Sequence, residues 1–143
     1  MYGIIVAAIA GAAMSIQGVF NTRLSEKIGL YESNLFVQGI AFILAIPIVY
    51  FLGNGSFAAL TQVNKLYWLG GVLGLLITVT VMMAIGSLSP TFAISIILIS
   101  QLLVAAIIDA FGLFGSEKIP FVWSKYVGLA LMIGGVILFK WKS

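Results

Sequence analysis

The chain has 143 residues and a formal net charge of +3, with 62% hydrophobic and only 8% charged residues. A soluble domain carries about 25% charged residues, so this composition and a mean hydropathy of +1.22 predict an integral membrane protein without a separate soluble domain. Cys and His are both absent, which excludes disulfides, thiolate or imidazole metal sites, Cys nucleophiles and His general bases. We therefore predict no enzymatic activity, no metal or other cofactor, and the lipid bilayer rather than nucleic acid as the surroundings of the chain.

Apolar runs long enough to cross a bilayer recur five times. At about 20 residues per crossing, they predict transmembrane helices at 2–21, 33–52, 66–87, 91–113 and 121–140. Aromatic side chains such as Trp68 and Trp123 lie near the ends of these runs, where the headgroup layer favours them. The expected fold is an all-α membrane protein, with residues 1–143 forming a single integral membrane domain.

The first two predicted helices carry amide side chains in pairs. Gln17 and Asn21 lie one turn apart, and Asn34 and Gln38 repeat that spacing, so each pair shares a helix face. These amides can line the path of a solute, with Gln17, Asn21 and Gln38 supplying hydrogen bonds. They can also serve the structure alone, because buried amides bridge helices and an Asn can end a helix in a left-handed conformation.

The third predicted helix carries a stripe of small and polar residues. Gly71, Gly74, Thr78 and Met82 follow one another at helical spacing on one face. Gly70 and Gly74 are separated by three residues, a spacing that lets membrane helices approach closely. We interpret Gly70 and Gly74 as packing positions and Thr78 as a candidate for binding substrate.

The fourth predicted helix has the most unusual polar content. At about 1.5 Å per residue, Gln101 lies about 15 Å from Thr91 and close to the bilayer centre. An amide at that depth needs hydrogen-bond partners that lipid does not provide. We therefore interpret Gln101 and the adjacent Ser100 as candidates for binding substrate.

Asp109 is the only acidic residue within the five predicted spans. It lies about 27 Å along the fourth helix, near the end of the span. An ionisable group within a membrane span indicates function by default, so Asp109 is a candidate coupling or gating group that handles a proton or cation. The alternative is a structural anchor that reaches interfacial water or pairs with Lys118 or Lys125.

The last predicted helix contains three glycines, Gly128, Gly134 and Gly135. Small residues at such positions usually mark close packing of membrane helices. We interpret the three as packing or dimerisation positions rather than contacts to a ligand.

Lysine and arginine are distributed almost evenly between the two ends of the predicted spans. The side of the N-terminus has three and the opposite side has four, namely Lys65, Lys118 and Lys125 against Arg23, Lys27, Lys140 and Lys142. Because Lys and Arg in short loops set orientation, a difference of one leaves two possibilities: a fixed orientation with the N-terminus outside, or dual topology. Five spans is an odd number, so two oppositely inserted copies would form inverted repeats, a recurrent transporter architecture.

Three segments together carry a family resemblance. The most specific is SQLLVAAIID, in which Asp109 follows Gln101 by eight residues; the others are Gln17 with Asn21 and Leu24, and the glycine-bearing GLALMIGGVIL. These segments resemble the YdcZ-like family, five-helix members of the drug/metabolite transporter superfamily, and the similarity runs nearly end to end. The resemblance implies a multi-pass protein of the bacterial inner membrane, related to half of a ten-helix transporter and working as an antiparallel pair of like or sister copies. The first span lacks the mid-helix Glu of the small multidrug resistance exporters, so their proton-driven mechanism is not expected here.

These features favour a secondary transporter of a small organic solute, working by alternating access at the interface of an antiparallel homodimer or of a pair with a sister copy. The predicted substrate-binding residues are Gln17, Asn21, Gln38, Thr78, Ser100 and Gln101. Asp109 would couple or gate transport. The alternatives are a dual-topology ion channel, which needs a continuous polar pore, and a membrane interaction subunit that transports nothing.

Overall fold

The computed structural model describes residues 1–141, which form helices joined by short connections. Five helical segments are long and apolar enough to cross a membrane. They are α1 (Tyr2–Ile28), α2 (Leu30–Leu52), α3 (Leu69–Ser87) with the short η2 (Lys65–Trp68) before it, α4 (Pro90–Phe111) and α5 (Trp123–Lys140). The connections contain two more short 3-10 helices, η1 (Phe57–Gln62) and η3 (Leu113–Gly115). The prediction of an all-α protein with five candidate spans is confirmed. Lys142, one of the four basic residues counted on the side opposite the N-terminus, lies outside the described residues.

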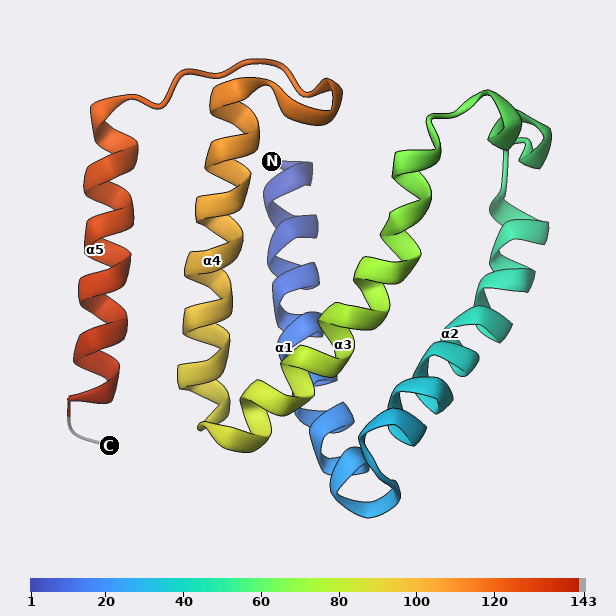
Figure 1. The fold of residues 1–143 in the computed structure, drawn as a ribbon, viewed down its shortest axis with the longest axis horizontal. Helices are drawn as coiled ribbons and strands as arrows, with labels where there is room; N and C mark the ends of the chain where they lie inside the picture. The colour runs from blue at the N-terminus through green and yellow to red at the C-terminus, as the bar shows by residue number, and fades with distance from the viewer. Residues whose placement is uncertain (142–143) are drawn as a thin grey trace. The chain divides into compact units, whose positions relative to one another are not determined.

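Contacts between helices divide the chain into two units, Met1–Ser87 and Leu88–Ser143. In the first unit α1 packs against both α2 and α3, as Figure 1 shows, and in the second α4 packs against α5. A single membrane domain for the whole chain stays a prediction.

Helix α1 is longer than the apolar run that the sequence presents. The predicted span ends at residue 21, but α1 continues to Ile28, and Asn21 lies buried inside it. An end of the helix at Asn21 is therefore wrong. The residues beyond it favour helix, and Arg23 donates two hydrogen bonds of 3.1 Å to the Glu26 carboxylate on the next turn. The backbone thus stays helical after the chain has become polar.

Gly29 is the single residue between α1 and α2. Its φ of +101° is a conformation that L side chains rarely adopt, and a Cβ there would collide with the Glu32 carboxylate. The Gly29 amide donates to the Ser25 carbonyl at 3.0 Å, and the Gly29 carbonyl accepts from the amide and hydroxyl of Ser33 at 3.1 and 2.7 Å. This turn places the start of α2, three residues earlier than predicted, beside the end of α1.

Helix α1 approaches α3 most closely at Gly18. A Cβ on Gly18 would lie 2.8 Å from Ile85 Cδ1 and 3.2 Å from Val81 Cγ1. Ile85 and Met82 are the buried side chains of α3, so the apolar core of the first unit lies at this contact. The missing side chain of Gly18 therefore sets the distance between the two helices.

The second unit is a hairpin of α4 and α5. Helix α4 ends at Phe111, two residues before the predicted boundary, because Gly112 adopts the left-handed conformation with φ +63°. The Asp109 carbonyl accepts hydrogen bonds from the amides of Gly112 at 3.3 Å and Ile119 at 2.8 Å. The connection is thereby tied to the end of α4 before α5 begins at Trp123.

Much of the helical surface is exposed within one chain. Every residue of α2 from 40 to 52 is exposed, and no residue of α5 is buried. In a membrane such surfaces face lipid or another protein. The described chain therefore leaves long helix faces free for a partner.

Candidate functional site

Polar side chains are buried where α1 ends and α2 begins. We call this set the polar junction; it consists of Asn21, Thr22, Ser33 and Asn34. The Thr22 hydroxyl donates to the Gly18 carbonyl and the Ser33 hydroxyl to the Gly29 carbonyl, both at 2.7 Å. Both hydroxyl protons are therefore already donated to backbone carbonyls of the same chain. The side chains of the junction that can still donate a hydrogen bond to a ligand are the amides of Asn21 and Asn34.

Asn34 has a buried amide oxygen without a donor. Its side chain is 5% exposed, and its Oδ1 accepts no hydrogen bond from any residue that the structure describes. Leaving a buried acceptor unsatisfied costs about 1–3 kcal/mol, and native structures rarely tolerate it. The oxygen is therefore an acceptor whose hydrogen-bonding capacity is unused within the described chain.

Two predicted substrate-binding residues meet between α2 and α3. Gln38 Nε2 donates to Thr78 Oγ1 at 3.5 Å, and Thr78 Oγ1 donates to the Gly74 carbonyl at 2.9 Å. Both side chains are half-buried. Because 3.5 Å is at the outer limit for a hydrogen bond, this contact holds Gln38 weakly and leaves its amide able to change partner.

Gln17 does not join Asn21 in a buried cluster. Asn21 is buried at the polar junction, whereas Gln17, one turn earlier, is exposed on α1. The Gln17 side chain makes no hydrogen bond with the described part of the chain. The helix face that the two residues were predicted to share is therefore buried at Asn21 and exposed at Gln17.

Ser100 and Gln101 lie in the middle of α4 and are both exposed. Ser100 lines a groove between α4 and α5. Gln101 has no side-chain hydrogen bond to any described residue. The midplane amide predicted from the sequence is thus open to whatever surrounds the chain.

Asp109 and Lys125 line one hollow of about 280 Å³ between α4 and α5. Its other walls are apolar and include Phe121, whose ring centroid lies 5.8 Å from Lys125 Nζ, within cation–π range. Among the described residues no ion pair joins Asp109 to Lys118 or Lys125. The two charged groups therefore line the same cavity without forming an ion pair with each other.

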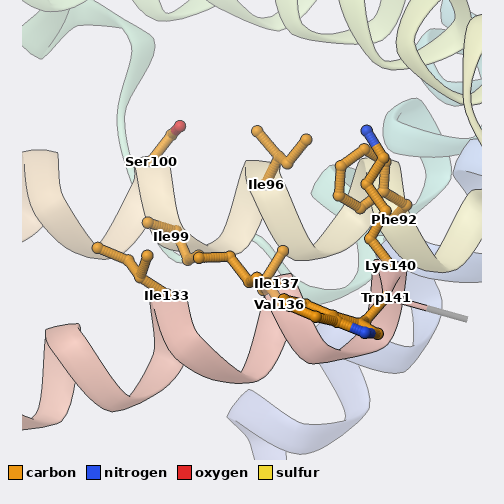
Figure 2. A pocket seen from close by; sticks show the side chains of 9 residues that line it. All are labelled: Phe92, Ile96, Ile99, Ser100, Ile133, Val136, Ile137, Lys140 and Trp141. Atoms are coloured by element: carbon orange, nitrogen blue, oxygen red, sulfur yellow. The ribbon is translucent and has the colours of Figure 1, made fainter.

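A larger hollow, here called the α4–α5 groove, has a volume of about 490 Å³. Figure 2 shows Ser100 and Ile133 at one end and Phe92, Lys140 and Trp141 at the other. Ile96, Ile99, Val136 and Ile137 line it between these ends. The groove is apolar except for Ser100 and the Lys140 end.

Nearly the whole chain matches one family model. Residues 2–138 match a family described as "Putative inner membrane exporter, YdcZ". The chain belongs to this family. The YdcZ resemblance carried by SQLLVAAIID and the glycine-bearing last helix is therefore confirmed. Searches of curated proteins and of solved structures gave no match.

Membership in the YdcZ family indicates the general class of membrane protein to which the chain belongs. The family description names an inner membrane exporter, and the part of the chain that the structure describes has five helices long and apolar enough to cross a membrane. It is therefore a transmembrane protein of an exporter family.

The five packing glycines predicted for this YdcZ-family chain have open surroundings. A Cβ on any of them would meet nothing within 4 Å in the described residues, which holds for Gly70, Gly74, Gly128, Gly134 and Gly135. Their role in packing against another copy stays a prediction. The close contact within the chain is instead made by Gly18.

Sequence reasoning about this YdcZ-family member missed several site residues. Thr22 and Ser33 gave no signal, because hydroxyl residues near helix ends usually face the interface. Lys140 was counted only as a loop charge, although its ammonium lies 4.8 Å from the Phe92 ring centroid. The i,i+4 spacing of Thr22 with Gly18 and of Ser33 with Gly29 was the pattern that could have indicated these local hydrogen bonds.

Proposed function

We propose that the chain is one half of a secondary transporter that exports a small organic solute across the bacterial inner membrane. Two copies, or one copy and a sister chain, insert in opposite directions and enclose the solute between them. Transport proceeds by alternating access, in which rocking of one half against the other opens the site to each side in turn.

The observation that carries this proposal is the open position of Gln101. It lies near the middle of α4 and is exposed, with no side-chain hydrogen bond to the described residues. Hydrocarbon supplies neither donors nor acceptors, so this amide requires a polar environment beyond its own chain. A partner copy and a solute held at the interface supply one.

The other polar groups have roles that follow from their surroundings. Asn34 Oδ1 is a free buried acceptor, and Gln38 is weakly bonded to Thr78. The proposed hydrogen bonds to the solute come from the amides and hydroxyls of six residues, namely Gln17, Asn21, Gln38, Thr78, Ser100 and Gln101. Asp109 shares its cavity with Lys125, and protonation or ion binding there couples to the opening of the site.

An antiparallel pair is supported by three independent features. The number of candidate spans is odd, so only oppositely inserted copies form inverted repeats. Lys and Arg divide three against four between the two ends, which gives no strong bias in orientation. The surfaces of α2 and α5 are free to be covered by a second copy.

A solute screen on the purified protein tests the proposal. Solutes that bind the folded state raise the melting temperature, and a hit is then assayed for flux into liposomes. Gln101→Leu should stay folded and dimeric but lose binding, because Leu removes the hydrogen bonds without adding an unpaired polar group. The matched control is Gln62→Leu, the same change at an exposed amide in η1, which should bind like the parent.

The flux assay separates this proposal from its alternatives. A carrier gives slow, saturable flux, a channel gives fast and ohmic flux, and an interaction subunit gives none. Ohmic flux by the parent protein would contradict the carrier mechanism. Normal saturable transport by Gln101→Leu would contradict the assigned role of Gln101.

A further inference from the structure

We infer that the α4–α5 groove binds an anionic phospholipid, with an acyl chain along the groove and the phosphate at Lys140. This site shares no lining residue with the Asp109 hollow. Of the proposed solute-binding residues, Ser100 alone lines it, at the end away from Lys140, and the proposed lipid contacts do not involve Ser100. The site has two halves, one apolar and one cationic.

The apolar half suits a hydrocarbon chain. Its walls are formed by branched aliphatic side chains of both helices, namely Ile96, Ile99, Ile133, Val136 and Ile137. From Ile133 to Lys140 the groove follows α5 for about 10 Å at 1.5 Å per residue. A volume of about 490 Å³ is enough for a stretch of acyl chain.

The polar half begins at the Lys140 end. A second hollow of about 360 Å³ is lined by Ser89, Thr91, Phe92, Phe139 and Lys140. Phe92 and Lys140 belong to both cavities, and the Lys140 ammonium lies 4.8 Å from the Phe92 ring centroid. A ligand that fills both cavities must therefore pass this lysine.

Charge selects the headgroup. Among the described residues that line either cavity, Lys140 is the charged one, and Ser89 and Thr91 line the smaller cavity. An ammonium with two hydroxyls favours a phosphate that carries a net negative charge. A zwitterionic lipid would bring an extra positive group to the lysine, so it binds less well.

The orientation of the two halves matches a lipid in a bilayer. Lys140 and Trp141 are at the end of the last span, where basic and tryptophan side chains mark the headgroup layer. The aliphatic walls continue from there toward the middle of α4 and α5. A phospholipid beside the protein already has its phosphate and chains in this order.

Native mass spectrometry of the purified protein in mild detergent tests the inference. Phosphatidylglycerol and phosphatidylcholine with identical chains are titrated, and bound lipid is counted. Since one lysine near a membrane contributes about 1 kcal/mol to anionic lipid binding, phosphatidylglycerol should bind about fivefold more tightly. Lys140→Gln should remove this preference, whereas Lys140→Arg should keep it.

Two further variants make the test specific. Val136→Trp fills the apolar half and should lower binding of both lipids, even if Lys140→Gln proves unstable. Lys65→Gln, at an exposed lysine of η2 that lines neither cavity, should leave the preference unchanged. The inference is overturned if Lys140→Gln keeps the preference, if glycerol phosphate without chains competes as well as the lipid, or if the groove binds no lipid because a second copy covers it.

Discussion

Replacing Gly18 by Leu is a direct test of how α1 packs on α3. The first added atom would lie 2.8 Å from Ile85 Cδ1 and 3.2 Å from Val81 Cγ1, closer than carbon atoms pack. Overpacking a close contact of this kind costs about 1–3 kcal/mol. We therefore expect the unfolding equilibrium constant of Gly18→Leu to rise about 5- to 150-fold in mixed micelles. Gly11→Leu is the control on the same helix, because a Cβ on Gly11 meets nothing within 4 Å.

A second substitution identifies the atom responsible. Ile85→Ala alone should destabilise the protein by opening a cavity at a buried site. The double variant, Gly18→Leu with Ile85→Ala, should lose less free energy of unfolding than the sum of the two single variants, because the new Leu occupies the space that Ile85 leaves. Additive effects, or a Gly18→Leu protein as stable as Gly11→Leu, would refute the close contact between α1 and α3.

Three further predictions concern the turn, the dimer and the coupling group. Gly29→Ala should lower the melting temperature, since φ +101° strains an L residue by about 1–3 kcal/mol and the new Cβ would collide with the Glu32 carboxylate; an unchanged melting temperature contradicts this. Gly134→Leu should convert a dimer into monomer in mild detergent, as measured by light scattering, because a large side chain prevents close helix approach. A dimer that persists would show that Gly134 does not lie in the dimer interface. Asp109→Asn should keep solute binding but lose pH- or ion-dependent flux, with Glu117→Gln in the loop as the unaffected control; parental flux from Asp109→Asn would remove its coupling role.

The helices could be predicted from the sequence because lipid imposes a strict requirement. A backbone in hydrocarbon must satisfy its own hydrogen bonds, so each apolar run of sufficient length becomes a helix. The end of an apolar run does not mark the end of a helix, however. α1 passes Asn21 and stops only at Gly29, where the backbone conformation changes. Hydropathy locates the membrane interface, whereas capping glycines locate the helix end.

The site could be predicted only in part. Gln38 and Thr78 were identified separately, but their contact joins residues 40 positions apart and depends on how α2 and α3 pack. Asn34 Oδ1 is buried in the folded chain, which no local spacing reveals. Gln101 and Gly134 are open within the chain, so their partners depend on assembly rather than on the fold of one copy.

The antiparallel pair is the central claim, and labelling of one introduced cysteine tests it most directly. Ile28→Cys lies exposed beside the α1–α2 turn, on a chain without cysteine, and it leaves all seven Lys and Arg residues in place. We predict that a membrane-impermeant maleimide modifies this cysteine from both faces of the membrane, in comparable amounts. Modification from one face only would contradict the antiparallel homodimer.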